Sequence, residues 1–182
     1  MTAKTSKTQA GNADPVDTTA LVEAVSVERL GNLLKDSGYR VTPVEQNGRI
    51  QLMSASQGLG FSVRFGNPGG QADSWIDFTF GCVLSVQGDL PPELISDWNR
   101  TRRFARLAQH QQFVVLEMDV LLAGGVSERH VRATVELWDH LLQQFLLHLR
   151  RSPTAAAAAG TEGVEGAETK PSGTLDVSET QQ

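Results

Sequence analysis

Two carboxylates in this 182-residue chain have a spacing that could support chemistry. Glu117 and Asp119 lie two residues apart in a predicted strand, so their side chains point to the same face of a sheet. Such a pair can transfer protons as a general acid and base, or bind a divalent cation. Both roles depend on the charges that surround the pair.

A dense basic cluster lies just before these carboxylates and consists of Arg100, Arg102, Arg103 and Arg106. A short turn at His110 and Gln111 would place Arg102 opposite Asp119 and Phe104 opposite Glu117, with Arg106 diagonal to Glu117. Arginines in those positions keep carboxylates ionised, whereas a general acid needs a raised pKa. We therefore expect a charge-compensated sheet face, and a hydrolase or transferase built on Glu117 and Asp119 is the least favoured hypothesis.

Two binding roles remain open for the arginine cluster, namely an anion or acidic peptide, and nucleic acid. Residues 26–151 carry 13 basic and 13 acidic side chains, although the whole chain has a net charge of −5. A nucleic-acid-binding surface usually has a strong positive excess and aromatic side chains for stacking. The neutral domain, with no exposed aromatics expected beside the cluster, therefore disfavours nucleic acid as the partner.

Other reactive residue types are sparse. Cys82 is the single cysteine, which excludes an intrachain disulfide and a cysteine-cluster zinc site and suits a reducing compartment. Among the histidines only His140 has a helical partner with ligand-like spacing, Glu136, and two ligands do not make a metal site. The glycines match neither nucleotide-binding fingerprint, and no serine lies in a nucleophile elbow. The sequence therefore predicts no enzymatic activity, no metal and no cofactor.

The elements that must position these residues alternate in a simple order. Helical patterns cover 27–37, 91–102 and 127–150, and strand patterns cover 39–46, 49–54, 59–65, 76–86, 104–108 and 113–122. Asn47-Gly48 marks a tight hairpin, and Gly124-Gly125 gives the backbone the freedom to pass from the last strand into the last helix. The order α-β-β-β-β-α-β-β-α, with hairpin-linked strands, predicts an α+β fold with helices packed on an antiparallel sheet.

The two ends of the chain differ in composition from its middle. Residues 1–25 are mostly polar, and residues 152–182 are rich in Ala, Gly, Glu and Thr with a net charge of −4. Neither segment has an apolar face to bury, so both are predicted to be disordered around a domain at 26–151. No apolar run approaches membrane-spanning length and no targeting segment is evident, which predicts a cytoplasmic protein without a membrane contact.

The last helix is more apolar than a core helix requires. Its inward stripe at 100° per residue consists of Val131, Val135, Trp138, Leu142, Phe145 and Leu149. Leu141 and Leu146 widen this stripe, Leu137 lies near its edge, and Leu147 falls on the opposite side. The helix is either a wide core element or a core element with a second face for a partner.

Several motifs in the second half of the chain occur in a recognisable order. These are Trp98-Asn99-Arg100, Arg103-Phe104, Leu116-Glu117-Met118-Asp119, Gly124-Gly125-Val126-Ser127, Trp138 and Phe145. Their order resembles the YbjN domain family of bacterial sensory transduction regulators, over roughly residues 26–149. The resemblance implies a fold similar to type III secretion chaperones, no known enzymatic activity and no catalytic residues to carry over. Within it, Asn99 is expected to bond backbone carbonyls at the helix end or in a neighbouring loop.

The leading hypothesis is a non-enzymatic, chaperone-like or regulatory protein-binding module that forms a homodimer. It would hold a segment of another protein through its sheet edge or helix surface, using Leu137, Leu141 and Leu147, with Arg100 and Arg106 as rim charges. The alternative is a regulator that binds an anionic ligand or nucleic acid through the cluster from Arg100 to Arg106.

Overall fold

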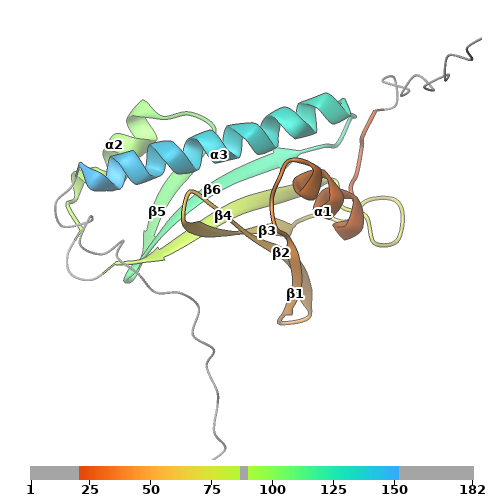
Figure 1. The fold of residues 1–182 in the computed structure, drawn as a ribbon, viewed down its shortest axis with the longest axis horizontal. Helices are drawn as coiled ribbons and strands as arrows, with labels where there is room; N and C mark the ends of the chain where they lie inside the picture. The colour runs from red at the N-terminus through yellow and green to blue at the C-terminus, as the bar shows by residue number, and fades with distance from the viewer. Residues whose placement is uncertain (1–20, 87–89, 152–182) are drawn as a thin grey trace, which may run out of the picture.

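The computed structural model describes residues 21–86 and 90–151, and within them the predicted element order is confirmed. The helices are α1 (Val27–Asp36), α2 (Glu93–Thr101) and α3 (Glu128–Arg150). The strands are β1 (Thr42–Gln46), β2 (Arg49–Ser56), β3 (Leu59–Phe65), β4 (Asp77–Ser85), β5 (Arg106–His110) and β6 (Phe113–Leu121). They form one six-stranded antiparallel sheet in the order β1-β2-β3-β4-β6-β5, so the predicted α+β class is correct (Figure 1).

Local sequence signals set the ends of the helices. The hydroxyls of Ser26 and Ser127 accept hydrogen bonds from Arg29 N and His130 N, both at 3.1 Å, and these bonds cap α1 and α3. Gly124 and Gly125 have φ of 87° and 88°, a left-handed conformation that glycine adopts without a steric penalty. Their conformation confirms the predicted passage from β6 into α3.

The core lies on one face of the sheet, where side chains of β3, β4 and β6 meet the helices. Trp138 of α3 stacks on Phe80 of β4 with ring centroids 5.3 Å apart, and Phe61 of β3 packs edge-on against the same indole. All six residues of the predicted inward stripe of α3 are buried. Figure 1 shows α3 along the sheet, with α2 beside its C-terminal half and α1 near the β1–β3 end.

Residues 21–25 belong to this fold, contrary to the prediction that the ordered domain begins at residue 26. Val22 pairs with Val126 and Val25 pairs with Trp75 in isolated bridges, and both valines are almost fully buried. Their burial offsets the entropy of ordering this segment, which its polar neighbours could not do. The rest of the predicted arm, 1–20, and the predicted tail, 152–182, lie outside the described residues. None of the described helices is both long and apolar enough to cross a membrane.

Candidate functional site

The face of the sheet opposite the helices is open, and it carries the carboxylates that the sequence singled out. Alternate residues of β4 and β6 turn away from the core, among them Thr79, Gly81, Glu117 and Asp119. The strand register sets Thr79 against Asp119 and Gly81 against Glu117. The centre of this open face is therefore polar.

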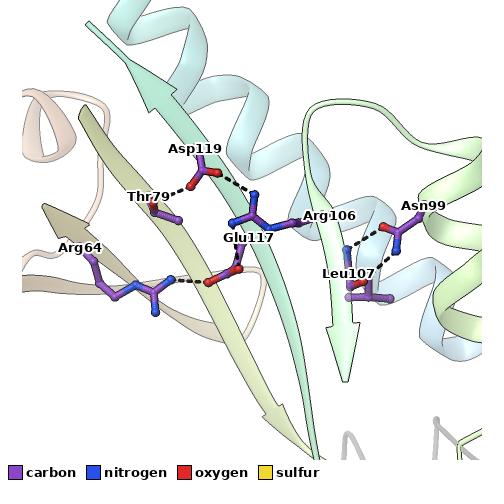
Figure 2. Close-up of polar contacts among 7 residues, drawn as sticks. All are labelled: Arg64, Thr79, Asn99, Arg106, Leu107, Glu117 and Asp119. Atoms are coloured by element: carbon purple, nitrogen blue, oxygen red, sulfur yellow. Dashed lines mark hydrogen bonds and ion pairs between the residues drawn. The ribbon is translucent and has the colours of Figure 1, made fainter. Parts of the chain in front are cut away.

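Five side chains on this face form a connected network, shown in Figure 2. Arg106 of β5 bonds Asp119 Oδ2 at 2.7 Å and Glu117 Oε2 at 3.2 Å, and Thr79 donates to Asp119 Oδ1 at 2.6 Å. Arg64 of β3 reaches Glu117 Oε1 from the other side. We call Arg64, Thr79, Arg106, Glu117 and Asp119 the ion-pair network.

The network changes the acidity of its members in the direction that favours charge. The hydrogen bond from Thr79, and then the hydrogen bond and charge of Arg106, hold the pKa of Asp119 below its ordinary value although partial burial opposes them. The bond to Asp119 in turn raises the pKa of Arg106. An ionised, paired Asp119 can anchor the arginine, but it is a poor proton donor near neutral pH.

The predicted pairing across β5 and β6 is wrong, because the turn lies one residue later than predicted and each β5 residue is therefore paired two residues further along β6. The turn lies at Gln111 and Gln112, where Gln111 has φ of 54°, so His110 pairs with Phe113 and Arg106 lies directly opposite Glu117. The sequence could not specify which residue would adopt the left-handed conformation, because neither Gly nor Asn marks this turn.

Arg102 and Phe104 consequently lie off the sheet instead of opposite the carboxylates. Arg102 ends α2, with its guanidinium carbon 5.9 Å from the centroid of the Trp98 ring. Phe104 has φ of 73°, which breaks the extended backbone, so β5 begins two residues later than predicted.

Arg64 is the member of the network that sequence analysis missed. Its alternation with Phe61, Val63 and Phe65 placed it on the polar side of β3, but nothing local revealed which strand would lie beside β3. It spans β4 above Gly81, where a β-carbon would lie 3.5 Å from the Arg64 Nη2 atom. A larger residue at position 81 would compete with the guanidinium for this space.

Apolar side chains flank the network on the open face. Leu121 is 63% exposed at one end of β6, and Val83 of β4 is 54% exposed toward the other end. Phe113, Met53 and Val44 are each more than a third exposed on the same face. The face therefore combines a fixed charged centre with an apolar periphery.

The predicted partner-binding leucines of α3 do not form one surface. Leu141 is only 3% exposed and belongs to the core, so its prediction as a contact residue is wrong for the folded domain. The helical wheel placed it beside the inward stripe, and the sheet is wide enough to cover it. Leu137 is partly buried against the core, and Leu147 alone is well exposed, at 55%.

The predicted rim charges also separate, because Arg100 pairs with Asp97 at 2.6 Å while Arg106 joins the ion-pair network.

The β5 edge of the sheet is partly occupied by α2. Asn99 Nδ2 donates to the carbonyl of Leu107 at 2.8 Å, and the Leu107 N–H donates to Asn99 Oδ1 at 2.9 Å, as Figure 2 shows. The indole of Trp98 donates to the carbonyl of Ala105 at 3.1 Å. Asn99 bonds backbone groups as predicted, but these belong to β5 and not to the helix end or a loop, and they are groups that an added strand would need.

The remaining candidates for chemistry lie apart from the open face. Cys82 is fully buried, and burial raises the pKa of its thiol to about 12, which makes it a poor nucleophile. His140 is exposed on α3, as predicted. Across 21–86 and 90–151, no three His, Cys, Asp or Glu side chains are grouped so that they could hold a metal ion.

The fold and this face define an α+β domain whose helices cover one side of an antiparallel sheet and leave the other side open. The family model described as "YbjN: Putative bacterial sensory transduction regulator" matches residues 26–151. The chain belongs to the YbjN family. A comparison with curated proteins gives no match.

Proposed function

We propose that this chain is a non-enzymatic regulatory module that binds a protein partner on the open face of its sheet. The observation that carries the proposal is the exposure of Val83 and Leu121 on both sides of the ion-pair network. Exposed apolar side chains on the same face as fixed charges are typical of protein interaction sites. The family description supports the regulatory part of this proposal.

The mode of binding follows from which surfaces are free. Asn99 already bonds the backbone of Leu107 on the β5 edge, and Pro43 removes an N–H from β1 at the other edge. Strand addition is thus hindered at both edges, whereas the open face presents side chains that can pack against a partner. We propose that the module holds a segment of its partner there in a chaperone-like manner, in the cytoplasm.

The ion-pair network would set the orientation in which a partner binds this surface. Arg106 and Arg64 hold Glu117 from two sides, so the charges are fixed before a partner arrives. Prearranged charges cost less ordering entropy on binding and reject partners with mismatched charge. A second copy of the chain is one candidate for the partner, which would make the module a homodimer.

Two matched variants test the location of the binding surface. The full-length chain, immobilised by a tag, is used to capture proteins from a bacterial lysate, and its own mass is measured by light scattering. We expect Val83→Glu with Leu121→Glu to lose a partner that the unmodified chain retains, or to convert a dimer into a monomer. Leu147→Glu, an equally exposed apolar position on α3, should leave both results unchanged.

The opposite pattern would overturn the proposal. Binding or dimerisation that depends on Leu147 and survives the two sheet substitutions would place the partner on α3. Circular dichroism of each variant checks that the fold is intact. We expect it to be, because all three substituted side chains are exposed.

A further inference from the structure

A second surface feature, separate from the open face, lies where α2 meets the C-terminal end of α3. A pocket of about 500 Å³ opens between these helices, which Figure 1 shows side by side. Its apolar walls include Pro91 and Leu94, and its basic walls include Arg100, Arg102 and Arg151. The predicted arginine cluster thus divides, because Arg106 belongs to the sheet and two other members line this pocket.

Arg102 has a partly buried side chain without a charged partner in the described part of the chain. Its guanidinium lies over the Trp98 ring, and its side chain makes no ion pair or hydrogen bond within 21–86 and 90–151. The Nε atom is buried without an acceptor among these residues. Partial burial of an unpaired charge is unfavourable, so an anion in the pocket would stabilise this arrangement.

The charges around the pocket favour an anion over a cation. Asp97 is already paired with Arg100 at 2.6 Å, which leaves Glu93 as the one other acidic residue of the lining. The two positive charges of Arg102 and Arg151 outnumber the single negative charge of Glu93. The pocket is therefore locally positive in a chain whose net charge is −5.

His148 adds a fixed polar group to the same lining. Its Nε2 lies 2.8 Å from the carbonyl oxygen of Leu94, so Nε2 carries the proton of this hydrogen bond. The ring packs edge-on against Trp98 at a centroid distance of 5.5 Å. Both contacts hold the imidazole in one orientation, and its Nδ1 makes no hydrogen bond in the described part of the chain.

We propose that this pocket binds a small organic anion whose carboxylate or phosphate group pairs with Arg102 and Arg151. The planar guanidinium of Arg102, held near the Trp98 ring, can present its N–H groups as the fork that carboxylates and phosphates bind. Pro91 would contact the apolar part of the same ligand, above the buried Leu94. This role goes beyond the proposed function, because it gives the module a ligand site apart from its partner-binding face.

The test is a titration of the ¹⁵N-labelled full-length chain, followed through backbone amides and the Nε–H signals of arginine. The probes are phenyl phosphate, benzoate and inorganic phosphate, at constant pH and ionic strength. We expect saturable shifts at Arg102, Leu94 and His148, with dissociation constants near or below about 1 mM for the probes that carry a ring. Phenyl phosphate should bind more tightly than inorganic phosphate if the apolar wall contributes.

Three variants distinguish a built site from general attraction. Arg102→Gln should weaken binding at least tenfold, and Arg102→Lys should also weaken it because lysine keeps the charge but loses the planar fork. Arg129→Gln, at an exposed position in the first turn of α3, should bind as the unmodified chain does.

Two results would refute the proposal. One is a set of shifts that never saturate and are shared by all exposed arginines, which would indicate counterion binding only. The other is binding by Arg102→Gln as tight as that of the unmodified chain. The titration of the unmodified chain can refute the proposal by itself. The test therefore remains decisive even where a variant fails to fold.

Discussion

The two faces of the sheet use the same strands for different purposes. On the helix side of β4 and β6, Phe78, Phe80, Leu116 and Met118 are all buried. On the other side, the intervening residues form the ion-pair network and its apolar flanks. Because strand side chains alternate, each strand contributes one residue in two to stability and leaves the next available for recognition. A substitution should therefore affect either folding or binding, depending on which face it lies on.

The largest expected effect comes from the covered face. Trp138→Ala removes the indole that stacks on Phe80 and contacts Phe61, and it leaves a cavity in the middle of the core. We expect a loss of about 3–5 kcal/mol in the free energy of unfolding, measured by urea denaturation. Val83→Ala on the open face serves as the control and should change stability by less than about 0.5 kcal/mol. Equal losses from both substitutions would mean that the two faces do not divide their roles.

An intermediate effect is expected at the edge where α2 meets the sheet. Asn99→Ala leaves the N–H and the carbonyl of Leu107 without their side-chain partners, which should cost about 1–3 kcal/mol. Urea denaturation gives the stability, and amide hydrogen exchange at Leu107 should accelerate more than exchange within β4. Asn32→Ala, at an exposed position of α1, is the matched control. Unchanged protection of Leu107 would show that Asn99 does not close this edge.

The covered face was predictable from sequence, because burial imposes a regular pattern on its residues. The alternation in β4 and the stripe of α3 placed Cys82, Trp138 and Phe145 in the core, and all three are buried. Hydrophobic periodicity reflects a constraint that acts at every second or every third to fourth residue. It fixes the class and order of elements without knowledge of which strands are neighbours.

The open face was predictable only in part, because it depends on register and on strand neighbours. The compensation of Glu117 and Asp119 by arginine was anticipated, but Arg106 pairs with Asp119 in the place predicted for Arg102, and Arg64 joins Arg106 at Glu117. The turn with its left-handed residue at Gln111 lies one residue later than predicted, which moves the β5–β6 pairing by two residues. Arg64 reaches the network across β4, and a long connection separates its strand, β3, from β4 in the sequence. Such details arise from tertiary packing, and local propensities do not encode them.

The smallest expected effect is the pH dependence that Asp119 confers on the open face. Its pKa is lower in the folded protein than in the unfolded chain, because Thr79 and Arg106 bond the charged form. The resulting stability is fully present above the unfolded value, near pH 4, and disappears as the pH falls through the lower folded value. Solvent screens this exposed pair, so the contribution should be at most about 1 kcal/mol.

Asp119→Asn isolates this contribution. The difference in unfolding free energy between the two proteins should be constant from pH 5 to pH 7. It should shrink below about pH 4, where Asp119 of the unfolded chain becomes protonated while the folded protein still holds it ionised. A difference that grows as the pH falls would mean that folding raises the pKa of Asp119. The network would then be a strained arrangement that a partner must relieve, and the open face could not present fixed charges in advance of binding.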